Sequence, residues 1–248
     1  MKTTTALLGS FLLFTGVTTS FILQAHAETV FSNPGIPHRE SIELSDRIDS
    51  KTGYVIARVD ISVHQEEREK YYLVNVAEGD LFINTIKLDY DTLTTISESR
   101  YDCKTGKVVE SYHNNGQGGI RFFNQEKGID KQFANSDKNI YSRYAYFLSF
   151  QGFPFEEGKS VTFASYVAEY GDALPMKVTC KGKKAVKVKA GTFNCYELEL
   201  SVDGWQSLFA SDKYYLYYAV DKPHQFIKYE EKDKNGQWYA NELVRVID

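Results

Sequence analysis

The sequence predicts a mainly β protein built on a single large, curled antiparallel sheet with one or two short helices. Three observations predict this fold class. Apolar and polar residues alternate along most of the chain, which is typical of strands with one wet face. Turn residues separate ten or more of these runs at regular intervals, as in antiparallel sheets. Aromatic residues make up 15% of the sequence, with 18 Tyr and 16 Phe, and aromatic residues favour strands.

The N-terminal 27 residues have the features of a secretory signal peptide. Lys2 is the only charged residue in this stretch, and residues 6–23 are mostly apolar. Ala25-His26-Ala27 then places small residues where a signal peptidase cuts. We expect cleavage after Ala27, and no transmembrane anchor afterwards, because no later run is long and apolar enough to span a bilayer. The expected location is the periplasm, with secretion from the cell as the alternative.

The mature chain is expected to contain an irregular lead-in and one β domain. Residues 28–53 lack a clean periodicity, whereas residues 54–248 carry alternating runs without a domain linker. Without Lys2, the chain has 28 basic and 33 acidic residues, a net charge of −5. This acidic balance predicts neither a nucleic-acid partner nor an anionic membrane surface.

The first part of the β domain is expected to form consecutive strands joined by polar turns. In the first strand Val55 and Val59 share one face, while Arg58 takes the other. The predicted strands are residues 54–63, 71–78, 81–89, 94–102, 108–113, 120–125 and 128–133. In residues 139–150, Tyr144 and Phe147 follow helical spacing, which predicts a short helix. Phe150, Phe153 and Phe155 then either pack in the core, which we favour, or form an aromatic gate over a cavity.

The second part centres on residues 186–202. Two alternating runs meet at Ala190-Gly191, where Gly191 can adopt a positive φ. After this turn Tyr196, Leu198, Leu200 and Val202 share one face, and Glu197 and Glu199 take the other. The predicted strands are residues 160–167, 174–181, 184–189, 192–202, 213–220, 224–233 and 237–247. Asn235-Gly236 predicts a type I′ turn between the last two strands.

The candidate ligand-lining residues belong to this central region. They are Tyr196, Leu198, Leu200, Tyr215 and Tyr217. A concave sheet face with aromatic residues can hold an apolar ligand. The same alternation is equally typical of a packed core, so both interpretations stay open.

The three cysteines allow several arrangements. Cys180 and Cys195 lie 15 residues apart on either side of the central turn, and a disulfide between them is possible in an exported protein. Separate free thiols, or pairing with Cys103, are the alternatives. Cys103 lies in a turn with no neighbouring His in the sequence, which favours a bystander thiol over a nucleophile.

The sequence contains no recognisable catalytic or metal-binding constellation. The His-x-x-x-His spacing and the Gly-x-Ser-x-Gly elbow are both absent. Glu197 and Glu199 are better explained by cross-strand pairing with lysines than by acid–base catalysis. We therefore expect a protein that is not an enzyme and that needs no metal or cofactor.

Residues 188–200 resemble a motif of a known protein family. Their pattern Val-x-Ala-Gly-Thr-Phe-x-Cys-x-x-Leu-x-Leu resembles the hallmark of a bacterial exported family of unknown function. Members of that family are thought to be similar to the half-open barrels of the lipoprotein carriers LolA and LolB. The resemblance implies a curved sheet with a concave apolar face, partly closed by helices. It does not imply the same cargo, because a fold does not fix a function.

Three functional hypotheses follow, in descending order of preference. The first is a cell-envelope binding module that holds a lipid or another apolar ligand in the concave sheet. The second is an envelope structural or assembly factor that contacts a partner protein through a sheet edge or a Tyr-rich patch. The third is a hydrolase, but the sequence contains no arrangement of catalytic residues that supports it.

Overall fold

The computed structural model describes residues 30–48, 51–114, 119–133, 139–167, 171–204, 214–232 and 236–247. The predicted signal peptide and Asn235 lie outside these residues. The first strands are β1 (Arg39–Ile48), β2 (Lys51–Glu66), β3 (Glu69–Glu78), β4 (Phe82–Asp89), β5 (Thr95–Asp102), β6 (Lys107–Asn114), β7 (Ile120–Asn124) and β8 (Ile129–Phe133). The later strands are β9 (Ile140–Ser142), β10 (Ser160–Val167), β11 (Asp172–Val188), β12 (Gly191–Val202), β13 (Tyr214–Ala219), β14 (Phe226–Lys232) and β15 (Trp238–Ile247).

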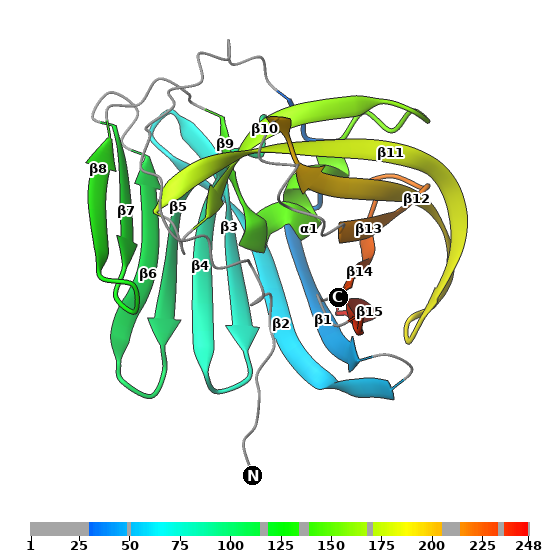
Figure 1. Ribbon diagram of the computed structural model, residues 1–248, viewed down its shortest axis with the longest axis horizontal. Helices are drawn as coiled ribbons and strands as arrows, with labels where there is room; N and C mark the ends of the chain where they lie inside the picture. Colours follow the sequence, from blue (N-terminus) through cyan, green and yellow to red (C-terminus); the bar gives the residue numbers. More distant parts are fainter. Residues whose placement is uncertain are drawn as a thin grey trace.

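All fifteen strands of the described residues belong to one sheet, which curls without closing (Figure 1). The order is β8-β7-β6-β5-β4-β3-β2-β1-β15-β14-β13-β12-β11-β10-β9. Neighbouring strands are antiparallel, except for the parallel pair β9 and β10. Pairing of β1 with β15 joins the two ends of the chain in the middle of the sheet. The predicted fold class, a single large curled antiparallel sheet, is confirmed.

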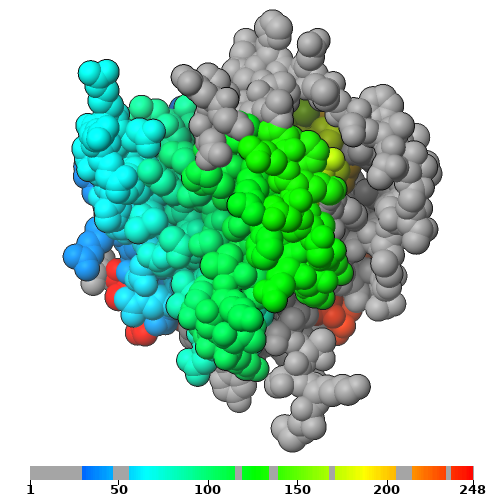
Figure 2. All heavy atoms as spheres, turned by 90° about the vertical axis from the view of Figure 1, so that its left-hand side faces the viewer, coloured from blue at the N-terminus to red at the C-terminus, as the bar shows by residue number. Residues whose placement is uncertain are grey.

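Side-chain packing brings the two ends of the sheet together along a seam. Tyr112 on β6 and Phe122 on β7 pack against Ile140 on β9 and Tyr166 on β10. The rings of Phe122 and Tyr166 are stacked with centroids 5.0 Å apart. From the side, β2 to β8 form a continuous outer wall, coloured cyan to green in Figure 2. The seam behind this wall therefore rests on aromatic contacts rather than on a continuous ladder of backbone hydrogen bonds.

A short helical segment fills the concave side of the sheet and is called the plug below. It consists of η1 (Arg143–Ala145), α1 (Tyr146–Ser149) and η2 (Phe150–Gly152). Figure 1 shows α1 enclosed between the two halves of the sheet. The Ser142 side chain caps the segment by accepting a hydrogen bond from the Tyr144 N–H. The helix predicted over residues 139–150 is thus present, beginning three residues after β9 starts.

Residues 30–38 form a strap that crosses the open end of the sheet. Phe31 is buried among Tyr141, Phe150 and Phe163, with centroid distances of 4.8, 5.0 and 5.7 Å. The Asn33 side chain donates to the Tyr72 hydroxyl and to a backbone carbonyl, and it accepts from two backbone N–H groups. These contacts hold the strap in place without secondary structure.

The structure corrects the predicted irregular lead-in at residues 39–53. Arg39–Ile48 form β1, whose Ile42 and Leu44 are buried, and β2 already begins at Lys51. This strand pairs with β2 on one side and β15 on the other. Its bulges interrupt the alternation, which explains why the sequence pattern looked irregular.

The hairpin of β11 and β12 is longer than the sequence predicts. The two expected strands 174–181 and 184–189 form a single β11, with a bulge at Gly182. At the tip, the Ala190 N–H donates to the Leu243 carbonyl of β15 over 3.1 Å, and Gly191 has a φ of +143°. The hairpin tip thus returns to the middle of the sheet, which gives the Ala-Gly pair a structural role.

Replacing Leu198 by Ala should lower the stability of the fold. Leu198 is fully buried between Cys180 and Leu216 on the neighbouring strands. We expect a loss of about 2–5 kcal/mol in the free energy of unfolding, measured by urea denaturation. Glu199→Ala is the control on the same strand, and it should cost no more than about 1 kcal/mol. A larger loss at Glu199 than at Leu198 would contradict the assigned faces of β12.

Adding a methyl group at Gly152 should loosen the strap. A Cβ atom there would lie 2.4 Å from the Ser32 carbonyl oxygen and 2.9 Å from the Ser32 nitrogen. We expect Gly152→Ala to cost about 1–3 kcal/mol, since backbone must move to admit it. Phe31→Ala should act on the same contact, so the double variant should lose less than the sum. Full additivity in thermal melts would show that the strap and the plug are independent.

Candidate functional site

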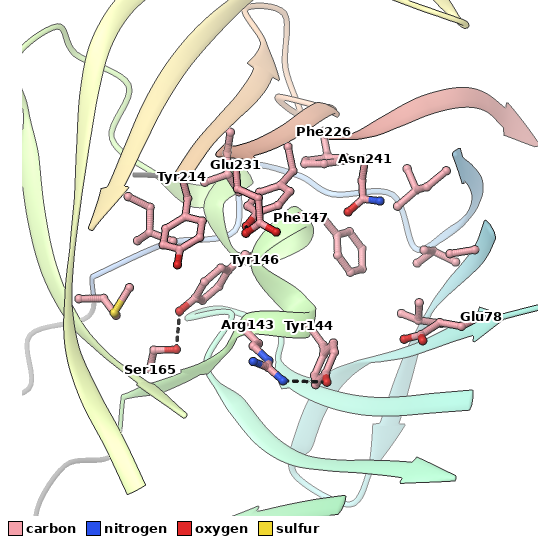
Figure 3. A pocket seen from close by; sticks show the side chains of 18 of the residues that line it. Glu78, Arg143, Tyr144, Tyr146, Phe147, Ser165, Tyr214, Phe226, Glu231 and Asn241 are labelled. Atoms are coloured by element: carbon pink, nitrogen blue, oxygen red, sulfur yellow. Dashed lines mark hydrogen bonds between the residues drawn. The ribbon is translucent and has the colours of Figure 1, made fainter. Parts of the chain in front are cut away.

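The concave side of the sheet encloses a cavity of about 120 Å³ beside the plug (Figure 3). Strands β1 to β3 and β10 to β15 contribute to its wall. The apolar lining residues are Leu44, Ile56, Ala57, Val59, Val76, Tyr146, Phe147, Val167, Leu174, Met176, Leu200, Tyr214, Leu216, Phe226 and Tyr229. The polar ones are Glu78, Arg143, Tyr144, Ser165, Glu231 and Asn241. Such a lining, mostly apolar with a few polar groups, is typical of small-molecule sites.

The polar groups of the cavity lie around the plug. Arg143 donates to the Tyr144 hydroxyl over 3.0 Å, and the Tyr146 hydroxyl is hydrogen-bonded to Ser165. In Figure 3, Tyr146 and Phe147 lie between the pair Arg143 and Tyr144 on one side and Glu231 on the other. The cavity is therefore apolar in its middle and polar at its periphery.

A buried polar cluster on β3 to β5 supports this end of the plug. Arg100 binds both carboxylate oxygens of Glu78 at 2.8 Å, and Asn84 donates to Glu78 over 2.7 Å. The Arg100 guanidinium lies over the rings of Phe82 and Tyr144, 4.0 and 5.4 Å from their centroids. A buried bidentate pair of this kind fixes the side chains it contacts, and it orients Tyr144 at the cavity wall.

Glu98 lies beside the buried polar cluster with its carboxyl group fully buried. Neither of its oxygens has a hydrogen-bond partner among the described residues. Burial, followed by the nearby negative charge of Glu110, raises the pKa of Glu98 to about 8. The Ser142 hydroxyl and the Arg143 and Arg100 charges lower it only in part. At neutral pH Glu98 is therefore largely protonated.

A second hollow, the mouth groove, lies on the other side of the plug and measures about 580 Å³. Its lining residues are 30–34 of the strap, 151–155, Tyr196, Val220, Lys222 and His224. Phe155 stacks on Tyr196 at 4.6 Å and lies 4.5 Å from the His224 ring. His224 Nδ1 is 3.0 Å from the Ala219 carbonyl, which indicates that this nitrogen carries a proton. The groove is thus aromatic on one wall and basic at its rim.

Comparison with known families gives one match. The family described as "Protein of unknown function (DUF3108)" matches residues 50–244. The chain belongs to the DUF3108 family. A search of curated proteins finds no match to it. The match includes residues 188–200, which carry the resemblance noted in the sequence.

Solved structures with similar folds are distant from this DUF3108 protein. A β-barrel-like DUF1849 protein from Brucella abortus is 10% identical, covering 85% of this chain and 96% of its own, with a TM-score of 0.42. The hypothetical lipoprotein YmcC from Escherichia coli is 8% identical, covering 83% and 86%, with a TM-score of 0.30. A protein with a YmcC-like fold from Bacteroides fragilis is 11% identical, covering 88% and 100%, with a TM-score of 0.33. These likenesses carry no argument about function.

The five candidate lining residues of the DUF3108 protein are divided among three places. Leu200 lines the cavity, Leu198 lies in the packed core beside it, and Tyr196 lines the mouth groove. The prediction that Tyr215 and Tyr217 line the cavity is corrected, since they pair with Glu199 and Glu197 on the opposite face of the sheet. Tyr217 donates to Glu230 over 2.6 Å. The positions of β13 that face the cavity are Tyr214 and Leu216.

The cysteines of the DUF3108 protein are free thiols in the structure. Cys103 is exposed, whereas Cys180 and Cys195 are buried. Cys180 lies opposite Leu198, and Cys195 lies opposite Lys184, so the two occupy different levels of the hairpin. Burial raises the pKa of both buried thiols, that of Cys195 to about 12. The proposed disulfide between Cys180 and Cys195 is therefore absent, and the alternative of separate thiols describes them.

Among the residues that the structure describes, no group of three or more His, Cys, Asp or Glu side chains is arranged to hold a metal ion. Over the same ranges, no helix combines the length and the apolarity needed to cross a bilayer.

Sequence reasoning missed the polar residues of the site, although a signal for Glu78 exists. Glu78 continues the inward-facing alternation of Tyr72, Val74 and Val76 on β3, and all four are buried. A carboxylate in phase with an apolar face is a sign of a buried partner. Arg143 has no such signal, because it precedes a helix whose orientation depends on the whole sheet.

Replacing Glu98 by Gln should flatten the pH dependence of stability. The pKa of Glu98 is about 8 in the folded chain, against an ordinary value of 4.5. Its contribution to stability is therefore fully present below pH 4.5 and is lost as the pH rises through 8. We expect Glu98→Gln to be more stable than the natural protein by several kcal/mol at pH 9, and by much less at pH 5.

Asp130→Asn is the control for this measurement. Asp130 is exposed, and its hydrogen bond from Arg121 lowers the pKa of its carboxyl group. This substitution should give the same difference from the natural protein at pH 5 and pH 9 in urea titrations. An equal effect of Glu98→Gln at both pH values would contradict a buried, protonated carboxyl group.

Proposed function

We propose that this protein is a non-enzymatic, exported protein of the cell envelope that holds the apolar part of an amphipathic ligand. The observation that carries this proposal is the cavity between the plug and the concave sheet. Its wall is apolar over most of its area, and its few polar groups lie at the periphery. Export is supported by the signal-peptide features of residues 1–27.

The volume of the cavity limits what it can hold. About 120 Å³ is close to the ~150 Å³ of an engineered apolar cavity that binds benzene, and below the ~300 Å³ of the smallest common ligand pockets. One ring or the end of one alkyl chain fits without rearrangement. A longer chain fits only after the plug has moved away from β10 to β14.

The periphery of the cavity indicates where a polar end of the ligand would lie. Arg143 and Tyr144 present a guanidinium and a hydroxyl group to the cavity, next to the neutralised pair of Glu78 and Arg100. These donors suit an acceptor such as a carboxylate, an ester or a phosphate. The proposed ligand is therefore an acyl-chain compound with an oxygen-rich end, rather than a pure hydrocarbon.

The proposal predicts that filling the cavity will block binding. The mature chain should bind the fluorescent fatty acid cis-parinaric acid in a saturable manner. Leu200→Phe places extra volume in the cavity, so the affinity should fall by at least about tenfold, the equivalent of one lost contact of ~1.4 kcal/mol. Leu200→Met, which conserves volume, should bind like the natural protein. Thermal melts of both variants verify that the fold is retained.

Native mass spectrometry of protein purified from its own envelope provides an independent test. It should show a bound species of lipid mass that is lost in the Leu200→Phe variant. If no lipid co-purifies and the natural protein shows no saturable probe binding, the ligand proposal fails. The alternative of an assembly factor that acts through protein contacts would then be preferred.

A further inference from the structure

The mouth groove differs from the cavity in both size and polarity. Its volume of about 580 Å³ lies within the range of roughly 300–1,000 Å³ that is typical of small-molecule sites. Polar atoms form the larger part of its wall, whereas the wall of the cavity is mostly apolar. The plug lies between the two hollows, with Phe147 in the wall of the cavity and Gln151 in the wall of the groove. The groove therefore suits a polar ligand that is distinct from an acyl chain.

Three rings from separate parts of the chain form one wall of the groove. Phe155 follows the plug, Tyr196 lies on β12, and His224 lies in the turn between β13 and β14. The Phe155 centroid is 4.6 Å from that of Tyr196 and 4.5 Å from that of His224. All three side chains are half-buried, so part of each ring stays open to the groove. The rings offer a rigid apolar surface against which the C–H face of a ligand can pack.

Two hydrogen-bond acceptors accompany the rings. His224 donates through Nδ1 to the Ala219 carbonyl over 3.0 Å, which leaves Nε2 of the neutral ring as an acceptor. Gln151 is 1% exposed, and its Oε1 atom has no hydrogen-bond partner among the described residues. Its amide nitrogen donates to the Phe147 carbonyl over 3.4 Å. A buried acceptor without a donor costs free energy, so a ligand with O–H or N–H groups would supply what these two side chains lack.

Lysine side chains make the groove electrostatically positive. Lys222 is exposed, and it carries the only full charge among the described residues that line the groove. Lys183 adds a second positive charge nearby, with its Nζ atom 5.3 Å from the Tyr196 ring centroid. Asp221 precedes Lys222 in the chain and Glu157 lies beside the β11 bulge, but neither lines the groove. An anionic group on a ligand would therefore be attracted to this rim.

The strap offers little backbone pairing to an extended peptide. The Ser32 N–H donates to the Gly152 carbonyl over 3.3 Å, and the Asn33 N–H donates to the Asp91 carbonyl over 2.9 Å. Pro34 has no N–H group. Binding of a peptide by strand addition needs a row of free main-chain groups. Recognition in this groove therefore depends on side chains, which favours a compact ligand over a peptide strand.

We propose that the mouth groove binds an acidic sugar, with one face of the sugar ring on Phe155 and Tyr196. Hydroxyl groups of the sugar donate to His224 and Gln151, and its carboxylate lies near Lys222. A uronic acid combines the three required properties in one small unit, namely an apolar C–H face, several O–H donors and one carboxylate. The site does not depend on the proposed lipid-binding function, because the groove and the cavity share no lining residue among those described.

Saturation-transfer NMR on the mature chain tests this assignment. We expect glucuronic, galacturonic and digalacturonic acids to give signals that are strongest at the ring C–H protons. At least one of the three should bind with a Kd of about 1 mM or below. Glucose, which lacks the carboxylate of glucuronic acid, should bind about threefold more weakly, as expected for the loss of an exposed ion pair. No signal from any of the three acids at about 10 mM would overturn the proposal.

Two variants with matched controls locate the contact. Tyr196→Leu should weaken binding of the tightest acid by about fivefold, because the ring face is lost. Lys222→Gln should remove the preference for glucuronic acid over glucose. The controls are Tyr101→Leu on β5 and Lys107→Gln on β6, which change exposed residues outside the groove and should bind like the natural protein. Thermal melts verify the fold of all four, and equal weakening in variants and controls would overturn the proposal.

A peptide ligand is distinguished by competition. The dipeptide acetyl-phenylalanyl-glutamate carries an aromatic ring, an N–H donor and carboxylates, so it presents the same kinds of groups without a sugar ring. We expect it to bind more weakly than the tightest sugar acid. If it binds more tightly and displaces all three acids, an acidic peptide is the better ligand and the sugar assignment is wrong.

Octyl glucuronide separates the headgroup of a glycolipid from a free sugar as the source of the ligand. If an alkyl chain reaches the cavity, it should tighten binding by at least about tenfold over glucuronic acid, and Leu200→Phe should abolish that gain. Equal affinities of the two compounds assign the groove to free saccharides. Either result supports the sugar site. Failure of cis-parinaric acid to bind would remove the lipid proposal alone, since glucuronic acid reports on the groove without any alkyl chain.

Discussion

A large sheet without a second layer must bury its apolar face against itself, and this constraint shapes the whole molecule. The sheet meets it by curling around the plug and the strap. Phe31, Tyr146, Phe150 and Phe163 pack mostly edge to face at the centre, with centroids 4.6 to 5.8 Å apart. Aromatic side chains suit this task, because each covers a large area with few rotatable bonds. The remaining space beside them is the cavity.

The interior of this curled sheet is less uniform than a normal hydrophobic core. Glu78, Arg100 and Glu98 lie on the concave face of β3 to β5, and each is mostly or fully buried. Burial of charge is costly unless the groups are paired, and Arg100 satisfies Glu78 through two hydrogen bonds. Glu98 avoids the cost by binding a proton. Of these three residues, only Glu78 lines the cavity.

Sequence alternation predicts most strands of this fold, because a strand with one solvent-facing side carries polar residues at every second position. This prediction fails where only the pairing with a distant strand determines which face of the sheet a residue takes. Four of the five residues from Tyr214 to Tyr218 are tyrosines, so only pairing with β12 shows that Tyr215 and Tyr217 lie on the sheet face opposite to Tyr214 and Leu216. Likewise, the plug places Arg143 at the cavity through contacts that no local pattern records.

The seam between the two ends of the sheet has a mechanical consequence. In a closed barrel, strand number and hydrogen-bond stagger fix the circumference. Here Tyr112, Phe122 and Tyr166 close the wall through ring contacts, which slide at little energetic cost compared with breaking a ladder of hydrogen bonds. The circumference of this half-barrel is therefore not fixed by backbone hydrogen bonds at the seam. Displacement at this one joint would leave the pairing of all fifteen strands unchanged.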